Sequence, residues 1–249
     1  MWRSGRRRFG SSPAVSGLSS GRVRSTRFRE PPEGSFVNPV LTGFYPDPSV
    51  VTANGRHYLV NSTFCYFPGI PVHESADLVS WKQIGSAIDR DGMLDCSGLG
   101  LSRGVFAPTI AFDNGVFYIA NTCVDCGGNF VVVARDPAGP WSDPIWMPHV
   151  GGIDPSIFFD DDGKVYVLNN DEPPAAALYD GHRAIYIREV DRETFAPKSE
   201  ARVLIDGGVR PEEKPIWIEG PHIFKRDGWY YLSAAEGGTA EGHSQVVLR

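Results

Sequence analysis

A short sequence pattern occurs four times in this chain, and each copy predicts the first two strands of a β-sheet. Every copy has a proline, one further residue, a hydrophobic residue, a turn ending in glycine, and an aromatic strand. The copies begin at residues 47, 107, 154 and 219. Each turn is Asn-Gly or Asp-Gly, which supplies the positive φ angles of a tight hairpin. The chain is therefore expected to fold as a series of hairpins.

The spacing of the copies favours a β-propeller. Successive copies start 60, 47 and 65 residues apart, which suits four-stranded blades with loops of variable length. A β-sandwich also has short strands, but it would not repeat the same proline-flanked position in successive units. The expected fold class is all-β, a propeller with three full blades and the inner half of a fourth.

Three of the four copies carry an acidic residue one or two positions before the proline. These residues are Asp47, Asp154 and Glu219, whereas the second copy has Ala107. The first strand of a propeller blade lies nearest the axis, so equivalent positions in successive blades face one another. We therefore expect the three carboxylates to converge on one pocket, an arrangement that suits acid–base chemistry.

Charge divides the chain into a basic head and an acidic remainder. Residues 1–30 hold eight arginines and one acid, Glu30, so the head carries +7 and the rest −13 of a net −6. The acidic remainder argues against nucleic acid as a partner. The head has no apolar periodicity, which predicts a disordered extension over 1–35. The remaining residues, 36–249, are expected to form the propeller domain.

The sequence predicts neither a secretory leader nor a membrane span. The basic head is not followed by the apolar run of a signal peptide, and no stretch approaches the ~20 apolar residues of a transmembrane helix. A cytoplasmic location is favoured, with an organelle-targeting extension or a non-native upstream start as alternatives for the head.

Four cysteines give no dense disulfide framework. They are Cys65, Cys96, Cys123 and Cys126, and the last two form a CxxC motif. No second pair and no histidine at ligand spacing accompanies this motif. It therefore predicts a loop with free thiols or one disulfide, and no metal ligand is assigned.

From about Asn38 to Arg249 the chain resembles glycoside hydrolase family 43, which contains five-bladed propellers that cleave β-xylosides and α-L-arabinofuranosides. The segments that carry the resemblance are 38–49, 62–69, 77–81, 139–144, 152–156, 219–222 and 235–239. They occur in the family's order and spacing. The resemblance implies about three and a half of five blades, with the chain ending before the last one.

The resemblance also implies roles for the three acids. Asp47 would be the general base, Glu219 the general acid, and Asp154 a residue that orients and tunes. We expect the charge of Asp154 to raise the pKa of Glu219 if the two lie within ~4–6 Å. Family 43 enzymes invert the anomeric configuration, and acids from different blades suit the ~6.5–9.5 Å separation of inverting enzymes.

Four further residues match positions of the family that line or underlie the sugar pocket. They are Phe64, Phe106, Thr239 and His243. Phe106 stands where the family usually has tryptophan, and it offers less stacking area and no indole N–H. The blade beyond residue 249 would carry an arginine that holds the sugar and Asp47.

The expected substrate is a xylo-oligosaccharide or arabinoxylan, and β-xylosidase is the first choice because residues 62–69 resemble that branch. The alternatives are an α-L-arabinofuranosidase and a non-catalytic carbohydrate-binding propeller. No cofactor is expected to be required, although the family often holds a structural calcium at the propeller axis. The sequence gives no oligomeric state.

Overall fold

Strands and tight turns alternate along the chain in the computed structural model, which describes residues 31–249. The first 30 residues of the predicted basic extension lie outside the described residues. By internal contacts the chain separates into Met1–Val37 and Asn38–Arg249, and every described strand lies in the second unit. Within the described residues, no helix has the length and apolar character that crossing a membrane requires.

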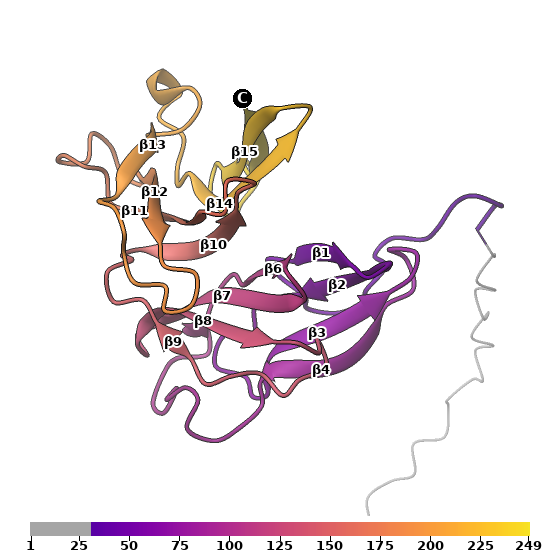
Figure 1. Ribbon diagram of the computed structural model, residues 1–249. Helices are drawn as coiled ribbons and strands as arrows, with labels where there is room; N and C mark the ends of the chain where they lie inside the picture. Colours follow the sequence, from indigo (N-terminus) through magenta and orange to yellow (C-terminus); the bar gives the residue numbers. More distant parts are fainter. Residues whose placement is uncertain (1–30) are drawn as a thin grey trace, which may run out of the picture. The chain divides into compact units, whose positions relative to one another are not determined.

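Four antiparallel sheets contain all of the described strands (Figure 1). The first has the order β1-β2-β3-β4, with β1 Ser49–Ala53, β2 Arg56–Val60, β3 Gly69–Ser75 and β4 Lys82–Ile88. The second joins β5 Gly104–Val105, β7 Val116–Val124, β8 Gly128–Ala134 and β9 Ile145–Trp146, and β6 Thr109–Asp113 also pairs with β7. Neighbours in each sheet are therefore mostly consecutive in sequence.

The third and fourth sheets repeat this order. The third is β10 Ile153–Phe159, β11 Val165–Asp171, β12 Ala184–Val190 and β13 Arg202–Asp206. The fourth is β14 Glu219–Arg226, β15 Trp229–Glu236 and β16 Ser244–Leu248. The fourth sheet thus has three strands, one more than the inner pair that the repeat predicts.

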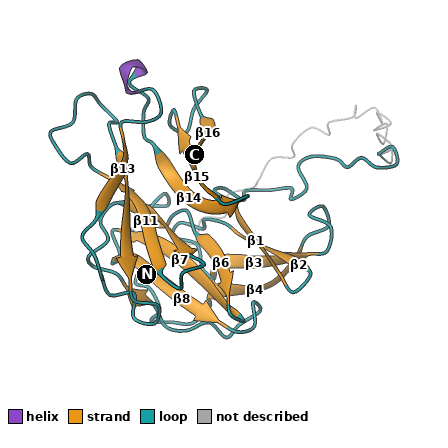
Figure 2. Ribbon diagram, turned by 45° about the horizontal axis from the view of Figure 1, so that its top comes forward, coloured by secondary structure: helices purple, strands orange, loops and turns teal. Residues whose placement is uncertain are grey.

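Almost all regular structure in the described residues is strand (Figure 2). The one described helix is a 3-10 turn, η1, at Pro211–Glu213 between the third and fourth sheets. The predicted all-β class is confirmed, and the four sheets are arranged as propeller blades.

Each repeat forms its hairpin as predicted. Asn54-Gly55, Asn114-Gly115 and Asp227-Gly228 have positive φ at both residues, the signature of a type I′ turn. The third repeat differs, because Asp162 has no positive φ while Gly163 does. There the Gly163 N–H bonds the Asp160 carbonyl at 3.0 Å, and the Asp160 N–H bonds that of Lys164 at 3.0 Å.

The first strands of the four repeats lie next to one another. β1 contacts β6, β6 contacts β10, and β10 contacts β14, and these strands follow one another through the middle of Figure 1. The repeat places its prolines at the starts of these strands. The prolines therefore lie where neighbouring blades meet.

Hydrophobic residues fill the space between successive sheets, but less so toward the end of the chain. One buried cluster packs the first two sheets around Val60, Phe117 and Trp141. A second joins the second and third sheets around Val131, Val167 and Phe195. The third holds only Ile185, Ile218 and Ala234 as buried members.

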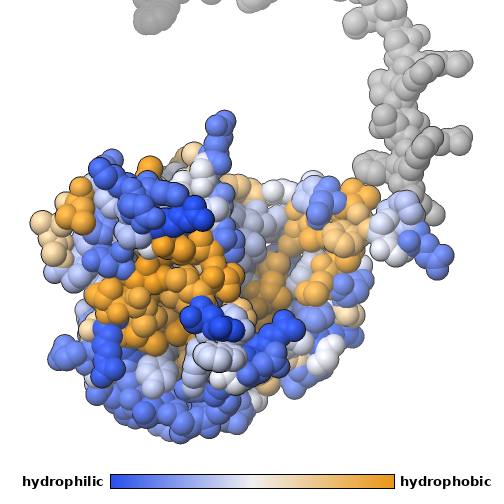
Figure 3. Space-filling model, turned by 90° about the horizontal axis from the view of Figure 1, so that it is seen from above, coloured by the Kyte–Doolittle hydropathy of each residue, from blue (hydrophilic) through white to orange (hydrophobic). Residues whose placement is uncertain are grey.

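The fourth sheet exposes several large hydrophobic side chains. On one face these are Phe224, Trp229 and Val247, which are between 42% and 59% exposed, whereas Tyr230 on the other face contacts Phe158 of the third sheet. A space-filling view from above shows apolar surface bordered by hydrophilic surface (Figure 3). This sheet thus has one face without the packing that the others share.

Candidate active site

The three acidic residues of the repeat lie at the beginnings of first strands. Asp47 stands two residues before β1, Asp154 is the second residue of β10, and Glu219 is the first residue of β14. Asp47 and Glu219 both raise the pKa of Asp154 through their charge, and Asp47 also raises that of Glu219. Because such effects require proximity, the structure brings the three carboxylates together.

An unusual backbone conformation precedes the proline in three of the four repeats. The φ angles are 53° at Asp47, 56° at Asp154 and 57° at Gly220, although residues before proline favour extended backbone. Left-handed backbone at non-glycine residues is uncommon and clusters at functional sites. In the last copy a glycine takes this position, and the acid moves one residue back to the longer side chain of Glu219.

Asp154 is the most buried of the three acids, with 8% of its surface exposed. Burial, the neighbouring Glu219 charge and then Asp47 raise the pKa of Asp154 to about 7, against a lowering by the Gly220 N–H. That N–H donates to Asp154 Oδ2 at 3.0 Å, and Asn170 Nδ2 donates to the same oxygen at 3.4 Å. Asp154 is therefore a carboxyl group that can be protonated near neutral pH.

Glu219 is half-buried beside two cationic or ionisable side chains. Burial raises the pKa of Glu219 most, and Asp47 raises it further, while His243 and Arg183 lower it. We expected Asp154 to raise the pKa of Glu219. The repulsion between them raises the pKa of Asp154, the more deeply buried group, and the effect on Glu219 stays a prediction.

Asp47 lies in the most open environment of the three. It is exposed, and its Oδ2 accepts a short hydrogen bond from the Ser62 hydroxyl. The Ser62 N–H also donates to the Pro46 carbonyl at 3.1 Å. Ser62 follows β2, so the first hairpin positions Asp47 through both backbone and side chain.

Three phenylalanines pack together, and one of them, Phe44, lies three residues before Asp47 in the chain. The Phe64 ring stacks on Phe44 with centroids 6.1 Å apart, and it meets Phe106 edge-on at 5.6 Å. The backbone fixes this contact, because the Phe64 N–H bonds the Val105 carbonyl at 2.8 Å and the Val105 N–H bonds the Phe64 carbonyl at 2.9 Å. Phe64 also has a positive φ of 52°. The two aromatics predicted to line the sugar pocket are thus neighbours.

His243 and Thr239 share the turn between β15 and β16. His243 Nδ1 lies 2.7 Å from the Gly238 carbonyl oxygen, and its charge acts on Glu219. Thr239 is exposed, and no described hydrogen bond joins it to the carboxylates. The structure therefore places His243 near the acid cluster. Thr239 lies in the exposed part of the same turn.

The described cavity nearest these aromatics does not contain the acids. It has a volume of about 580 Å³ and is lined by Phe64, Cys65, Arg90, Cys96 and Val105, among others. Its lining residues come mainly from the segment after β2, from the loop after β4 and from β5. The acid cluster and this cavity are separate features.

Among the described residues, no group of three or more carboxylates lies close enough to share the structural calcium that the resemblance implies. The one group of three or more His, Cys, Asp or Glu residues whose ligand atoms lie close enough to share an ion is Cys96, Cys123 and Cys126. Calcium takes six to eight oxygen ligands, so a calcium ion stays a prediction of the resemblance.

Several residues at this site were not singled out in the sequence. Ser62 binds Asp47, Asn170 and the Gly220 N–H bind Asp154, and Arg183 acts on Glu219. A signal was present for Asn170, because polar Asn169 and Asn170 interrupt the apolar strand β11 and are both buried. No feature of the neighbouring sequence indicated Arg183, which lies directly before β12.

Fold and site define a β-propeller with a cluster of carboxylates at the starts of its innermost strands. The profile of Glycosyl hydrolases family 43 matches residues 36–249, and the chain belongs to this family.

Individual relatives agree with this assignment. A xylosidase/arabinosidase of Butyrivibrio fibrisolvens is 45% identical over 85% of this chain and 41% of its own length. A non-reducing end α-L-arabinofuranosidase of Bacteroides ovatus is 40% identical over 86% of this chain and 38% of its own. The crystal structure of a GH43_12 protein from a capybara gut metagenome has a TM-score of 0.80 and 48% identity, covering 84% of this chain and 40% of that one. The chain thus spans about 40% of the length of these relatives.

Proposed function

We propose that this chain is a glycosidase that removes terminal β-1,4-linked xylose from xylo-oligosaccharides by single-displacement, inverting hydrolysis. The observation that carries the proposal is the cluster of Asp47, Asp154 and Glu219, whose three environments differ. Hydrolysis of a glycosidic bond requires one protonated and one ionised carboxyl group at the same time. A cluster with one exposed, one half-buried and one buried acid supplies both states.

Glu219 is the proposed general acid. Its raised pKa, caused first by burial, favours the protonated form that donates to the leaving oxygen. His243 and Arg183 limit this rise, so that Glu219 can lose its proton during the reaction. After bond cleavage the departing alcohol carries that proton away.

Asp47 is the proposed general base. It is exposed and accepts a hydrogen bond from Ser62, which orients the carboxylate. In an inverting reaction this carboxylate takes a proton from the water that attacks the anomeric carbon. The new C–O bond forms on the face opposite the leaving oxygen.

Asp154 is the proposed tuning residue. With a pKa of about 7, it is largely protonated at mildly acidic pH and adds little negative charge beside Glu219. As pH rises, the two groups share the loss of protons, which is the behaviour of a coupled pair. Asp154 also holds the Gly220 N–H, and thereby the backbone next to Glu219.

Phe64 and Phe106 are proposed to bind the sugar by stacking, with Thr239 and His243 at the opposite turn. Aromatic faces suit the apolar C–H surface of a pentose ring. We propose that no cofactor takes part in the reaction.

An α-L-arabinofuranosidase is the second candidate, and it is favoured by the similarity to the Bacteroides ovatus α-L-arabinofuranosidase. The two reactions would use the same carboxylates and differ in the sugar held against Phe64. A propeller that binds these sugars without cleaving them is the third possibility, because the chain spans about 40% of its relatives.

Release of 4-nitrophenol from the β-D-xyloside and the α-L-arabinofuranoside tests the proposal. The purified chain is expected to hydrolyse the xyloside faster, and Glu219→Gln is expected to slow the release roughly 100–10,000-fold. A faster arabinofuranoside reaction would select the second candidate. Saturable binding of xylobiose with no release of nitrophenol would select the third. Proton NMR of the first sugar anomer formed should show inversion, and retention would contradict the single-displacement mechanism.

A further inference from the structure

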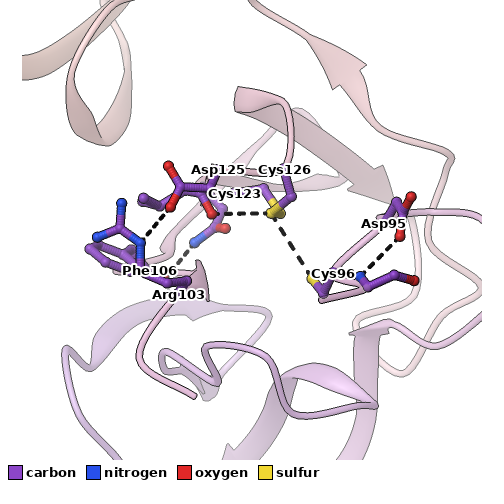
Figure 4. The surroundings of a disulfide bond; sticks show 10 residues. Asp95, Cys96, Arg103, Phe106, Cys123, Asp125 and Cys126 are labelled. Atoms are coloured by element: carbon purple, nitrogen blue, oxygen red, sulfur yellow. Dashed lines mark hydrogen bonds and ion pairs between the residues drawn. A yellow bond between two sulfur atoms is a disulfide. The ribbon is translucent and has the colours of Figure 1, made fainter. Parts of the chain in front are cut away.

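Three of the four cysteines of this chain meet at one place, although the sequence separates them. Cys123 and Cys126 form a disulfide across the β7–β8 turn. The Cys96 sulfur, which comes from the loop after β4, faces this disulfide at 4.0 Å from the Cys126 sulfur (Figure 4). The three sulfur atoms all lie within 4.8 Å of one another.

The geometry points to a metal site in the reduced chain: we propose that Cys96, Cys123 and Cys126 bind a soft divalent ion of the zinc class through three thiolates. Thiolate sulfur selects zinc and other soft ions over calcium or magnesium. Two cysteines separated by two residues are a common half of a zinc site. The fold supplies the third ligand, which the sequence spacing does not reveal.

The sulfur separations fit this ion. Zinc–sulfur bonds of about 2.3 Å at tetrahedral angles place two ligand sulfurs about 3.8 Å apart. The observed 4.0 Å between Cys96 and Cys126 is already close to that value. Only the bonded pair, Cys123 and Cys126, has to separate for the three atoms to surround an ion.

The turn that carries the CxxC motif is held by bonds other than the disulfide. The Cys126 N–H donates to the Cys123 carbonyl at 3.2 Å, and Arg103 Nε bonds Asp125 Oδ2 at 2.6 Å. Cys123 itself pairs with Val105 and with Gly128 in the second sheet. Reduction therefore leaves the backbone of both cysteines in place while their sulfur atoms separate.

Burial also matches a ligand site with one open coordination position. Cys123 is fully buried, whereas Cys96 and Cys126 are partly exposed. Cys96 lines the cavity of about 580 Å³ described above. Three protein ligands and one open position are typical of zinc sites that accept water or another small ligand.

Loading the site requires a reductant and releases protons. A thiol or phosphine reductant supplies two electrons, and two protons convert the S–S bond into two thiols. Each thiol then loses its proton as it binds the ion as thiolate.

Cobalt titration of the whole chain tests the proposal without relying on glycosidase activity. The chain is reduced with a phosphine, freed of reductant under nitrogen, and titrated with Co²⁺ as a spectroscopic substitute for zinc. We expect one ion per chain, a sulfur-to-cobalt charge-transfer band, and loss of this band when zinc is added. A reduced, folded chain without the band would overturn the proposal.

Serine variants assign the ligands. Cys96→Ser should weaken cobalt binding by more than the about 10–100-fold that loss of an outer-shell partner costs. Cys65→Ser is the matched control, because Cys65 lines the same cavity but lies outside the group of three, and its affinity should not change. Unchanged affinity in Cys96→Ser, or an equal loss in Cys65→Ser, would contradict the three-cysteine site.

A measurement on the unaltered chain covers the case in which a variant fails to fold. Maleimide labelling of the reduced chain is followed by mass spectrometry with and without zinc. Zinc should protect Cys96, Cys123 and Cys126 and leave Cys65 reactive. Equal labelling of Cys96 in both samples would overturn the assignment. The oxidised chain should bind no cobalt through sulfur.

Discussion

The backbone N–H of Gly220 donates a 3.0 Å hydrogen bond to Oδ2 of Asp154, across 66 residues of sequence. This bond joins the starts of β10 and β14, which are first strands of neighbouring blades. Because Gly220 follows Glu219 directly, the bond fixes the backbone of one acid to the side chain of another. The acid cluster is therefore built into the contact between blades.

Replacing Asp154 by asparagine should stabilise the fold at neutral pH. The pKa of Asp154 is about 7 in the folded chain and about 3.9 when unfolded. The folded state thus binds more protons between these values, so this carboxyl lowers the free energy of unfolding as pH rises from about 4 to 7. Asp154→Asn should remove this fall, which is worth roughly 2–4 kcal/mol at pH 7.

Urea unfolding at several pH values measures this effect, and Asp77→Asn is a control of opposite sign. Hydrogen bonds from the Ser80 and Val79 N–H groups hold the pKa of exposed Asp77 below its usual range. The stabilisation that the Asp77 carboxylate contributes to the fold is therefore present above its unfolded pKa and is lost as pH falls. A constant difference between the Asp154→Asn variant and the original chain at all pH values would contradict the account.

Loss of the Ser62 hydroxyl should impair the general base. Ser62→Ala removes the hydrogen bond to Asp47, and a bond to a charged group is worth about 1.5–3 kcal/mol. We expect kcat to fall roughly 10–100-fold. Ser80→Ala is the matched control, since its hydroxyl donates to Asp77 at 3.0 Å on an outer turn. Equal kcat in both variants would remove Ser62 from the mechanism.

Loss of the Phe64 ring should weaken sugar binding. Phe64→Ala removes a ring that contacts Phe44 and Phe106. We expect KM to rise about tenfold, which corresponds to the upper end of the free energy of an aromatic contact. Phe224→Ala serves for comparison, because Phe224 stacks on Tyr231 at 5.2 Å in the fourth sheet. An unchanged KM in Phe64→Ala would place the sugar elsewhere.

The repeat carried most of what could be predicted from the sequence. Hairpin turns such as Asn54-Gly55 are local, so their chemistry is visible in adjacent residues. The three acids, Asp47, Asp154 and Glu219, occupy nearly equivalent positions in the repeat. Those positions were enough to predict that the three carboxylates converge. The left-handed backbone of Asp47 and Asp154 was not predictable, because sequence rules favour extended backbone before proline.

Contacts between distant segments set the rest of the site. The hydrogen bond from Ser62 to Asp47 and the approach of Arg183 to Glu219 depend on how loops return to the axis. The same holds for Cys96, which lies 30 residues from Cys126 in sequence. The CxxC motif was interpreted as isolated because its third cysteine comes from a loop of the first blade.

The proton donor is the centre of this account, and leaving-group dependence tests it most directly. Hydrolysis rates of the original chain and Glu219→Gln are compared for a 4-nitrophenyl and a 2,4-dinitrophenyl glycoside of the preferred sugar. The dinitrophenolate departs without protonation. The account predicts a loss of roughly 100–10,000-fold on the nitrophenyl substrate and a much smaller loss on the dinitrophenyl one. An equal loss on both substrates would show that Glu219 does not donate the proton.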